Sequence, residues 1–100
     1  MSALSALHKF VHDRFREVFG APDNSLGRDD HWAIMPGPDQ APIHVLVNGA
    51  ADRPAIWVFD PHSVADRVYR ASIKDEDELY KVIKHIEHRV QRAAAMNASK

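Results

Sequence analysis

The 100-residue chain contains no cysteine, which excludes a disulfide scaffold, a catalytic thiol and a zinc site built on thiolates. No apolar run approaches the roughly 18 residues that a membrane-spanning helix needs. The first residues, Met1 to Phe10, show no basic start followed by an apolar block, so we expect no secretory signal peptide. Glycine-rich phosphate loops, dinucleotide fingerprints and serine elbows are also absent. These absences favour a small, soluble, cytoplasmic domain.

Neither sign of charge dominates the chain. It has 13 Lys and Arg against 14 Asp and Glu, a formal charge of -1 before its 7 histidines are counted. Apolar residues make up 45% and charged residues 27%, the composition of an ordered globular protein. Residues 1–100 are therefore expected to form a single domain, with one thin core.

Two segments carry the periodicity of amphipathic helices. In the first, residues 3–19, apolar side chains recur at steps of three and four, and Gly20 and Pro22 suit its end. The second covers residues 75–95, with Asp75 as N-cap and Glu78 at the spacing of a capping box. Residues 96–100 are expected to fray. The two apolar stripes are Leu4, Leu7, Val11, Phe15 and Val18 in the first helix, and Leu79, Val82, Ile83, Ile86, Val90, Ala93 and Ala94 in the second.

Three segments between the helices have the length and composition of strands: 31–35, 43–47 and 55–59. A proline-rich stretch separates the first two, and a turn over 48–54 separates the second from the third. Residues 64–73 are ambiguous, because 63–69 fit a short helical turn and Tyr69, Ala71 and Ile73 fit a short fourth edge strand. We favour a loop that ends in a short extended segment. The predicted fold is α+β in two layers, with an N-terminal helix, a three-stranded antiparallel meander and a C-terminal helix.

Both faces of the predicted sheet are apolar, although an exposed antiparallel face normally alternates with polar residues. Either the helices lie on opposite faces, or they share one face and the other is a contact surface. Aromatic residues and methionine are enriched in the cores of protein interfaces, and the usual interface of this kind is a two-fold homodimer. The second interpretation predicts a protein-interaction or self-associating module, without cofactor or catalysis, whose contact residues are Trp32, His44, Leu46, Trp57 and Phe59.

Acidic and histidine residues at the ends of predicted strands suggest the main alternative function, a small enzyme. If the two ends converge, they could hold a divalent metal or perform acid–base chemistry, as in a small metal-dependent hydrolase. The simpler explanation is that aspartate is common in turns and caps. The residues of this alternative are Asp29, Asp30, His31, Asp60 and His62.

The remaining histidines fall in helical pairs. His85 and His88 are three residues apart, among lysine and arginine side chains on the predicted outer face of the last helix, and we expect them to be solvated. His8 and His12 lie in or beside the first apolar stripe, where we expect partly buried imidazoles with hydrogen-bond partners.

The predicted order of helix, three strands and helix resembles that of the double-stranded-RNA-binding domain. The resemblance is confined to the order of elements, and it implies binding through lysines at the start of the last helix. Here that helix starts with four acidic residues, 75–78, which would repel phosphate. The near-neutral charge also offers little counterion release. Weak nucleic-acid binding therefore stays a minor alternative, and the sequence alone does not identify a partner.

Overall fold

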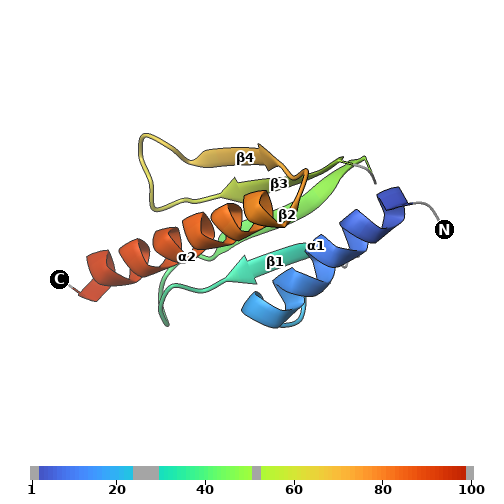
Figure 1. The fold of residues 1–100 in the computed structure, drawn as a ribbon. Coiled ribbons are helices and arrows are strands. Elements are labelled where there is room, and N and C mark those ends of the chain that lie inside the picture. Colours follow the sequence, from blue (N-terminus) through green and yellow to red (C-terminus); the bar gives the residue numbers. More distant parts are fainter. Residues whose placement is uncertain (1–2, 24–29, 51–52, 99–100) are drawn as a thin grey trace.

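The computed structural model describes residues 3–23, 30–50 and 53–98. The elements in chain order are α1 (Ala3–Phe19), β1 (His31–Ile34), β2 (Ile43–Ala50), β3 (Arg53–Phe59), β4 (Val68–Ser72) and α2 (Glu76–Ala98). The four strands form an antiparallel meander in the order β1-β2-β3-β4 (Figure 1). The predicted α+β fold is confirmed, and the fourth edge strand is present where we favoured a loop.

The hairpin between β2 and β3 is tighter than the turn predicted over 48–54, because pairing extends to Ala50 and Arg53. Gly49 adopts a positive φ of 92° within β2. A Cβ at this position would lie 2.9 Å from the backbone nitrogen of Ala55, so only glycine fits. Asn48 is held in the sheet because its Oδ1 accepts a hydrogen bond of 3.0 Å from Trp57 Nε1.

The helix ends follow the sequence signals. The backbone N–H of Gly20, at φ 87°, donates to Arg16 O over 3.0 Å and ends α1. The Oδ1 atom of Asp75 accepts from the backbone N–H of Glu78 over 2.9 Å and caps α2. That helix continues past residue 95 to Ala98. Within the described residues, no helix has the length and apolarity to cross a bilayer.

Both helices lie on the same face of the sheet, which makes the domain two-layered (Figure 1). The interpretation with helices on opposite faces is therefore wrong. The core lies between the helices and the sheet, and neither helix covers the other face. The core contains Val11, Phe15, Trp32, Ile43, Val45, Val47, Ile56, Val58, Ile73, Leu79, Val82, Ile83, Ile86 and Ala93.

Candidate interaction surface

The strand register determines which side chains share the sheet face that neither helix covers. Alternate residues point to opposite faces, and core residues such as Val45 and Val58 identify the helix side. We call the other side the open face. Its described members are His31, Ala33, His44, Leu46, Asn48, Arg53, Ala55, Trp57, Phe59, Val68, Arg70 and Ser72.

Four of the five predicted contact residues lie together on the open face: His44, Leu46, Trp57 and Phe59. Trp32 does not belong with them, and we correct its assignment. It pairs with Val45 in the register, is 1% exposed, and donates from Nε1 to Gly20 O over 3.0 Å. Because both rows of β1 are apolar, sequence alternation alone did not show which row faces the helices.

Trp57 and Phe59 form the aromatic centre of the open face. Their rings are nearly parallel, with centroids 6.3 Å apart and an interplanar angle of 8°. The Arg70 guanidinium lies 5.4 Å from the centroid of the Trp57 ring, and Asn48 accepts the indole N–H. Phe59 is 39% exposed. The tryptophan is thus fixed by neighbours on both adjacent strands, while the phenylalanine remains available for contact.

His31 and His44 form a direct side-chain pair on the same face. His31 Nε2 lies 2.8 Å from His44 Nδ1, a hydrogen bond in which one ring donates and the other accepts. The ring centroids are 5.0 Å apart. His31 is 5% exposed, and its Nδ1 has no hydrogen-bond partner among the described residues. The pair joins the edge strand β1 to β2.

A shallow hollow of about 370 Å³ adjoins this centre at the β4 side. Phe59 and Val68 contribute apolar surface, and Arg67 supplies a cation. The hollow is lined by Ala41, Pro42, His44, Phe59, Asp60, Pro61, Arg67 and Val68. Because the hollow is shallow and open to solvent, it suits a side chain of a partner better than an enclosed small molecule.

The described residues of the alternative metal or acid–base site lie at two separate places in the sheet. Asp30 and His31 lie at the start of β1, whereas Asp60 and His62 follow the far end of β3. Asp60 is 2% exposed and accepts from Arg89, and the imidazole Nε2 of His62 lies 2.7 Å from the carbonyl oxygen of Ala41. Asp29 lies outside the described residues. Among the residues described, no three acidic or histidine side chains gather as a metal site would require.

Arg89 is the buried polar residue that sequence reasoning missed. It is 1% exposed, and its guanidinium donates to Asp60 Oδ2 over 2.9 Å and Asp66 Oδ2 over 2.7 Å. Its Nε donates to His85 Nε2 over 2.7 Å. The only sequence signal was its position inside the apolar stripe of α2. Because its donors are directed to fixed acceptors, this cluster joins the segment after β3 to α2.

His85 is not solvated as predicted, since its ring stacks on Tyr69 with centroids 4.0 Å apart. Burial, with a further contribution from the Arg89 cation, lowers the pKa of His85 below its usual 6.5. Of the other helical pair, His12 packs against Trp32 with ring centroids 5.3 Å apart. The side chain of His8 lies outside what the structure describes.

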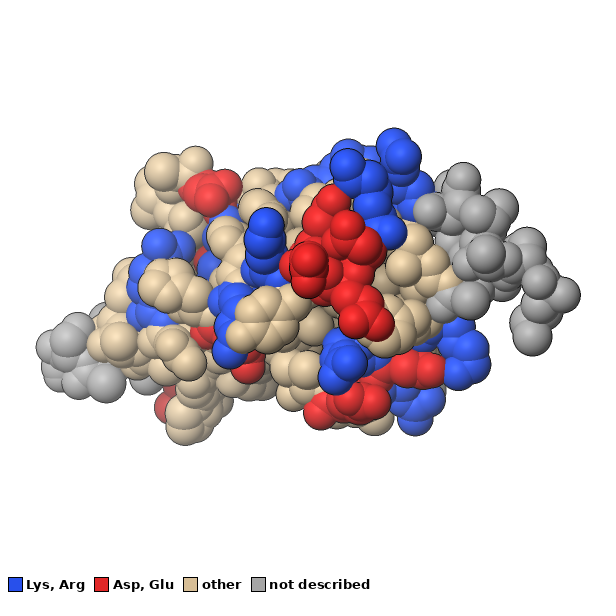
Figure 2. Space-filling model, in the orientation of Figure 1, with Lys and Arg blue, Asp and Glu red and all other residues tan. Residues whose placement is uncertain are grey.

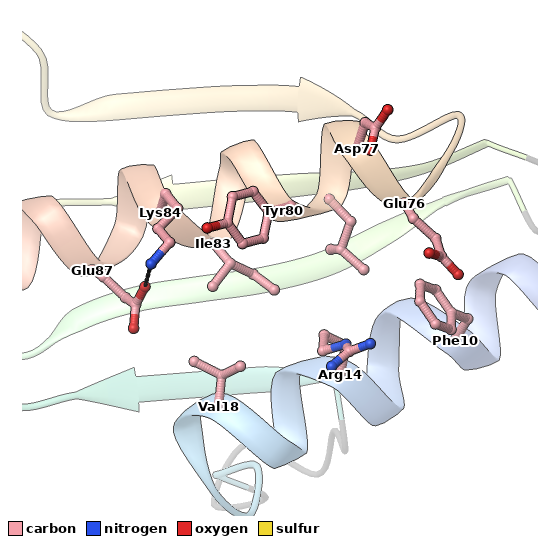
Figure 3. Close-up of a pocket in the computed structure, with 10 residues that line it drawn as sticks. Phe10, Arg14, Val18, Glu76, Asp77, Tyr80, Ile83, Lys84 and Glu87 are labelled. Atoms are coloured by element: carbon pink, nitrogen blue, oxygen red, sulfur yellow. Dashed lines mark ion pairs between the residues drawn. The ribbon is translucent and has the colours of Figure 1, made fainter.

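A second concave feature, of about 440 Å³, lies between α1 and α2 (Figure 3). Its aromatic residues already have partners, since Arg14 lies 5.6 Å from the Phe10 centroid and Lys84 lies 5.3 Å from the Tyr80 centroid. Lys84 also pairs with Glu87 at 3.8 Å. Val18, predicted for the core, borders this groove and is 40% exposed. The groove mixes both signs of charge and is a weaker candidate than the open face.

Comparison with known proteins identifies no relative: no protein-family model matches the chain, and no curated protein or solved structure shows significant similarity to it.

Proposed function

We propose that this chain is a non-catalytic protein-interaction module whose contact surface is the open face of the sheet. The observation that carries the proposal is an aromatic and apolar centre on a face that neither helix covers. A water-facing antiparallel sheet is normally polar at alternate positions, and here Leu46, Trp57, Phe59 and Val68 occupy them. Monomers rarely expose such a patch, whereas interface cores are rich in aromatic side chains.

The arrangement of the centre also favours recognition. Trp57 is held by Asn48 and Arg70 before any partner arrives, so little side-chain entropy is lost on binding. Polar residues, among them Ser72 and Arg53, surround the aromatic centre as in the rim of an interface. The partner is another protein or a second copy of the chain, in the cytoplasmic setting that the sequence favours.

The test combines self-association with selection of binding peptides. Sedimentation velocity between about 10 and 300 µM covers the affinities expected of a weak homodimer. In parallel, a displayed library of random peptides is selected against the wild-type protein. Both measurements are then repeated with the variants Phe59→Ser and Tyr80→Ser. Tyr80 is the matched control because it is an aromatic residue on α2 that is 62% exposed.

We expect self-association or peptide binding to fall at least about tenfold in Phe59→Ser and to change less than twofold in Tyr80→Ser, because interface energy concentrates in central aromatic residues. Equal effects of the two substitutions would overturn the proposal. So would a wild-type protein that stays monomeric and selects no peptide sensitive to Phe59→Ser.

A further inference from the structure

We infer that the partner of the open face is an acidic protein segment, one that combines carboxylates with apolar side chains. This inference rests on the proposed function and specifies the chemistry of the partner.

Among the residues that the structure describes, the formal charges on the open face are all positive. The strands β1 to β4 contain no Asp or Glu, and their two arginines, Arg53 and Arg70, both occupy open-face positions. Arg67 lines the adjoining hollow. None of these three guanidinium groups pairs with a carboxylate of the described residues. The helix side differs, because both signs are interspersed there (Figure 2) and several ion pairs form, such as Lys9 with Asp13 at 2.6 Å.

Two described carboxylates of the segment between β3 and β4, those of Asp60 and Asp66, already pair with Arg89. Asp60 lines the hollow but is 2% exposed, and its Oδ2 accepts a hydrogen bond from the Arg89 guanidinium over 2.9 Å in a buried ion pair. Asp66 precedes Arg67 in the chain, and its Oδ2 lies 2.7 Å from Arg89. Because the buried arginine takes both carboxylates, Arg67 and Arg70 remain available to carboxylates of a partner.

The positions of the cations fit a particular kind of segment. Arg70 lies beside Trp57 at the aromatic centre, and Arg67 borders the hollow formed by Phe59 and Val68. A partner segment that places an apolar side chain in this hollow brings its neighbouring residues to the two arginines. Carboxylates at those neighbouring positions would meet unpaired cations at the rim, where charge complementarity steers association and sets specificity.

Two other partners of the open face, a nucleic-acid strand and a second copy of the chain, fit less well. A nucleic-acid strand needs free aromatic faces for stacking, but the Trp57 ring already packs against Arg70 and Phe59. A second copy would bring the same arginines to the interface without bringing an acidic residue from its described strands. Both are outcomes of the experiment below.

The experiment uses two synthetic peptides with identical apolar residues, one carrying glutamates and the other lysines at the remaining positions. Each is titrated into the isotope-labelled 100-residue chain, and binding is followed by the amide NMR signals of β2, β3 and β4. A thymidine oligonucleotide is titrated in the same way, and sedimentation of the protein alone reports self-association. The charge-reversed variant is Arg67→Glu with Arg70→Glu, and the matched control is Arg16→Glu with Arg92→Glu, two exposed helix arginines.

We expect the glutamate peptide to bind the open face at least about tenfold more tightly than the lysine peptide. Its affinity should fall as the salt concentration rises, because salt screens the attraction between its carboxylates and the arginines. The charge-reversed variant should invert this preference, and the control variant should keep it. Equal binding of both peptides at the open face would overturn the acidic partner and leave the proposed function standing. Tighter binding of the oligonucleotide, or self-association that outcompetes the glutamate peptide, would also overturn it. If neither peptide shifts the open face, the acidic partner is overturned. The proposed function fails as well only if the protein also stays monomeric and the displayed library yields no peptide sensitive to Phe59→Ser.

Discussion

At the scale of single residues, His85 shows how a tertiary contact changes the chemistry of a side chain. Its Nε2 accepts a hydrogen bond from Arg89 Nε, so the ring must be neutral, with its proton on Nδ1. Protonation of Nε2 would break this bond and place a second cation beside Arg89. Burial is the first cause of the lowered pKa, the Arg89 charge adds to it, and the Asp66 carboxylate opposes it.

This lowered pKa makes the stability of the protein depend on pH. Below the usual histidine pKa of 6.5 the unfolded chain binds a proton at this position, while the folded chain resists doing so. The contribution of His85 is therefore complete above about pH 6.5 and is lost as the pH falls toward its lower native pKa. We expect His85→Gln to flatten this part of the stability profile, measured by urea unfolding between about pH 5 and 7.5. His88→Gln, at an exposed position on the same helix, is the control. Identical slopes in both variants and the wild type would refute the assignment.

At the scale of the elements, the two glycines with positive φ differ in what surrounds them. Gly20 ends α1 at φ 87° with no atom within 4 Å of an added Cβ. Gly49 lies in the β2–β3 hairpin at φ 92°, where the added Cβ would approach Ala55 N to 2.9 Å and Arg53 O to 3.0 Å. Both positions impose the strain of a left-handed backbone, but only the hairpin adds a clash with the paired strand.

Replacing each glycine with alanine separates these two effects. We expect Gly20→Ala to destabilise the fold by about 1–2 kcal/mol, the cost of the left-handed conformation alone. Gly49→Ala should cost at least about 1 kcal/mol more, because the backbone of β3 must move to relieve the contact. Chemical denaturation of the two variants gives the comparison. If Gly20→Ala proves the more harmful substitution, the close packing of the hairpin does not determine its stability.

At the scale of the whole molecule, local signals predicted the two helices and the first three strands, whereas β4 was only the alternative to a loop. Non-local geometry decided which side chains share a face of the sheet. Periodicity and capping residues such as Asp75 and Gly20 predicted where the helices start or end, because those interactions form within a few residues. The face chosen by the helices could not be read from β1 or β3, since both of their rows are apolar. Trp32 was therefore assigned to the contact surface although it lies in the core. The strand register likewise kept Asp60 away from His31, which no local pattern could show.

Arg89 was missed for the same reason, because its partners are distant in the sequence. It connects α2 to Asp60 after β3 and to Asp66 before β4, and its guanidinium lies 5.9 Å from the Tyr69 centroid. An arginine at 1% exposure is tolerated because its donors are directed to carboxylates and a carbonyl. Removing the cation would leave Asp60 buried at 2% exposure without its counter-charge.

We expect Arg89→Ala to destabilise the domain by about 3–5 kcal/mol, the usual cost of an uncompensated buried charge. Arg92→Ala removes an exposed arginine one turn along the same helix and should stay within about 0.5 kcal/mol of the wild type. Urea unfolding measures both. Arg89→Lys should fall between them, because it retains the charge but not the planar fork that reaches Asp60 and Asp66 together. Adding Asp60→Asn to Arg89→Ala should recover part of the loss, since it removes the charge left without a partner. If Arg89→Ala is as mild as Arg92→Ala, the packing of the two layers alone holds the β3–β4 segment against α2.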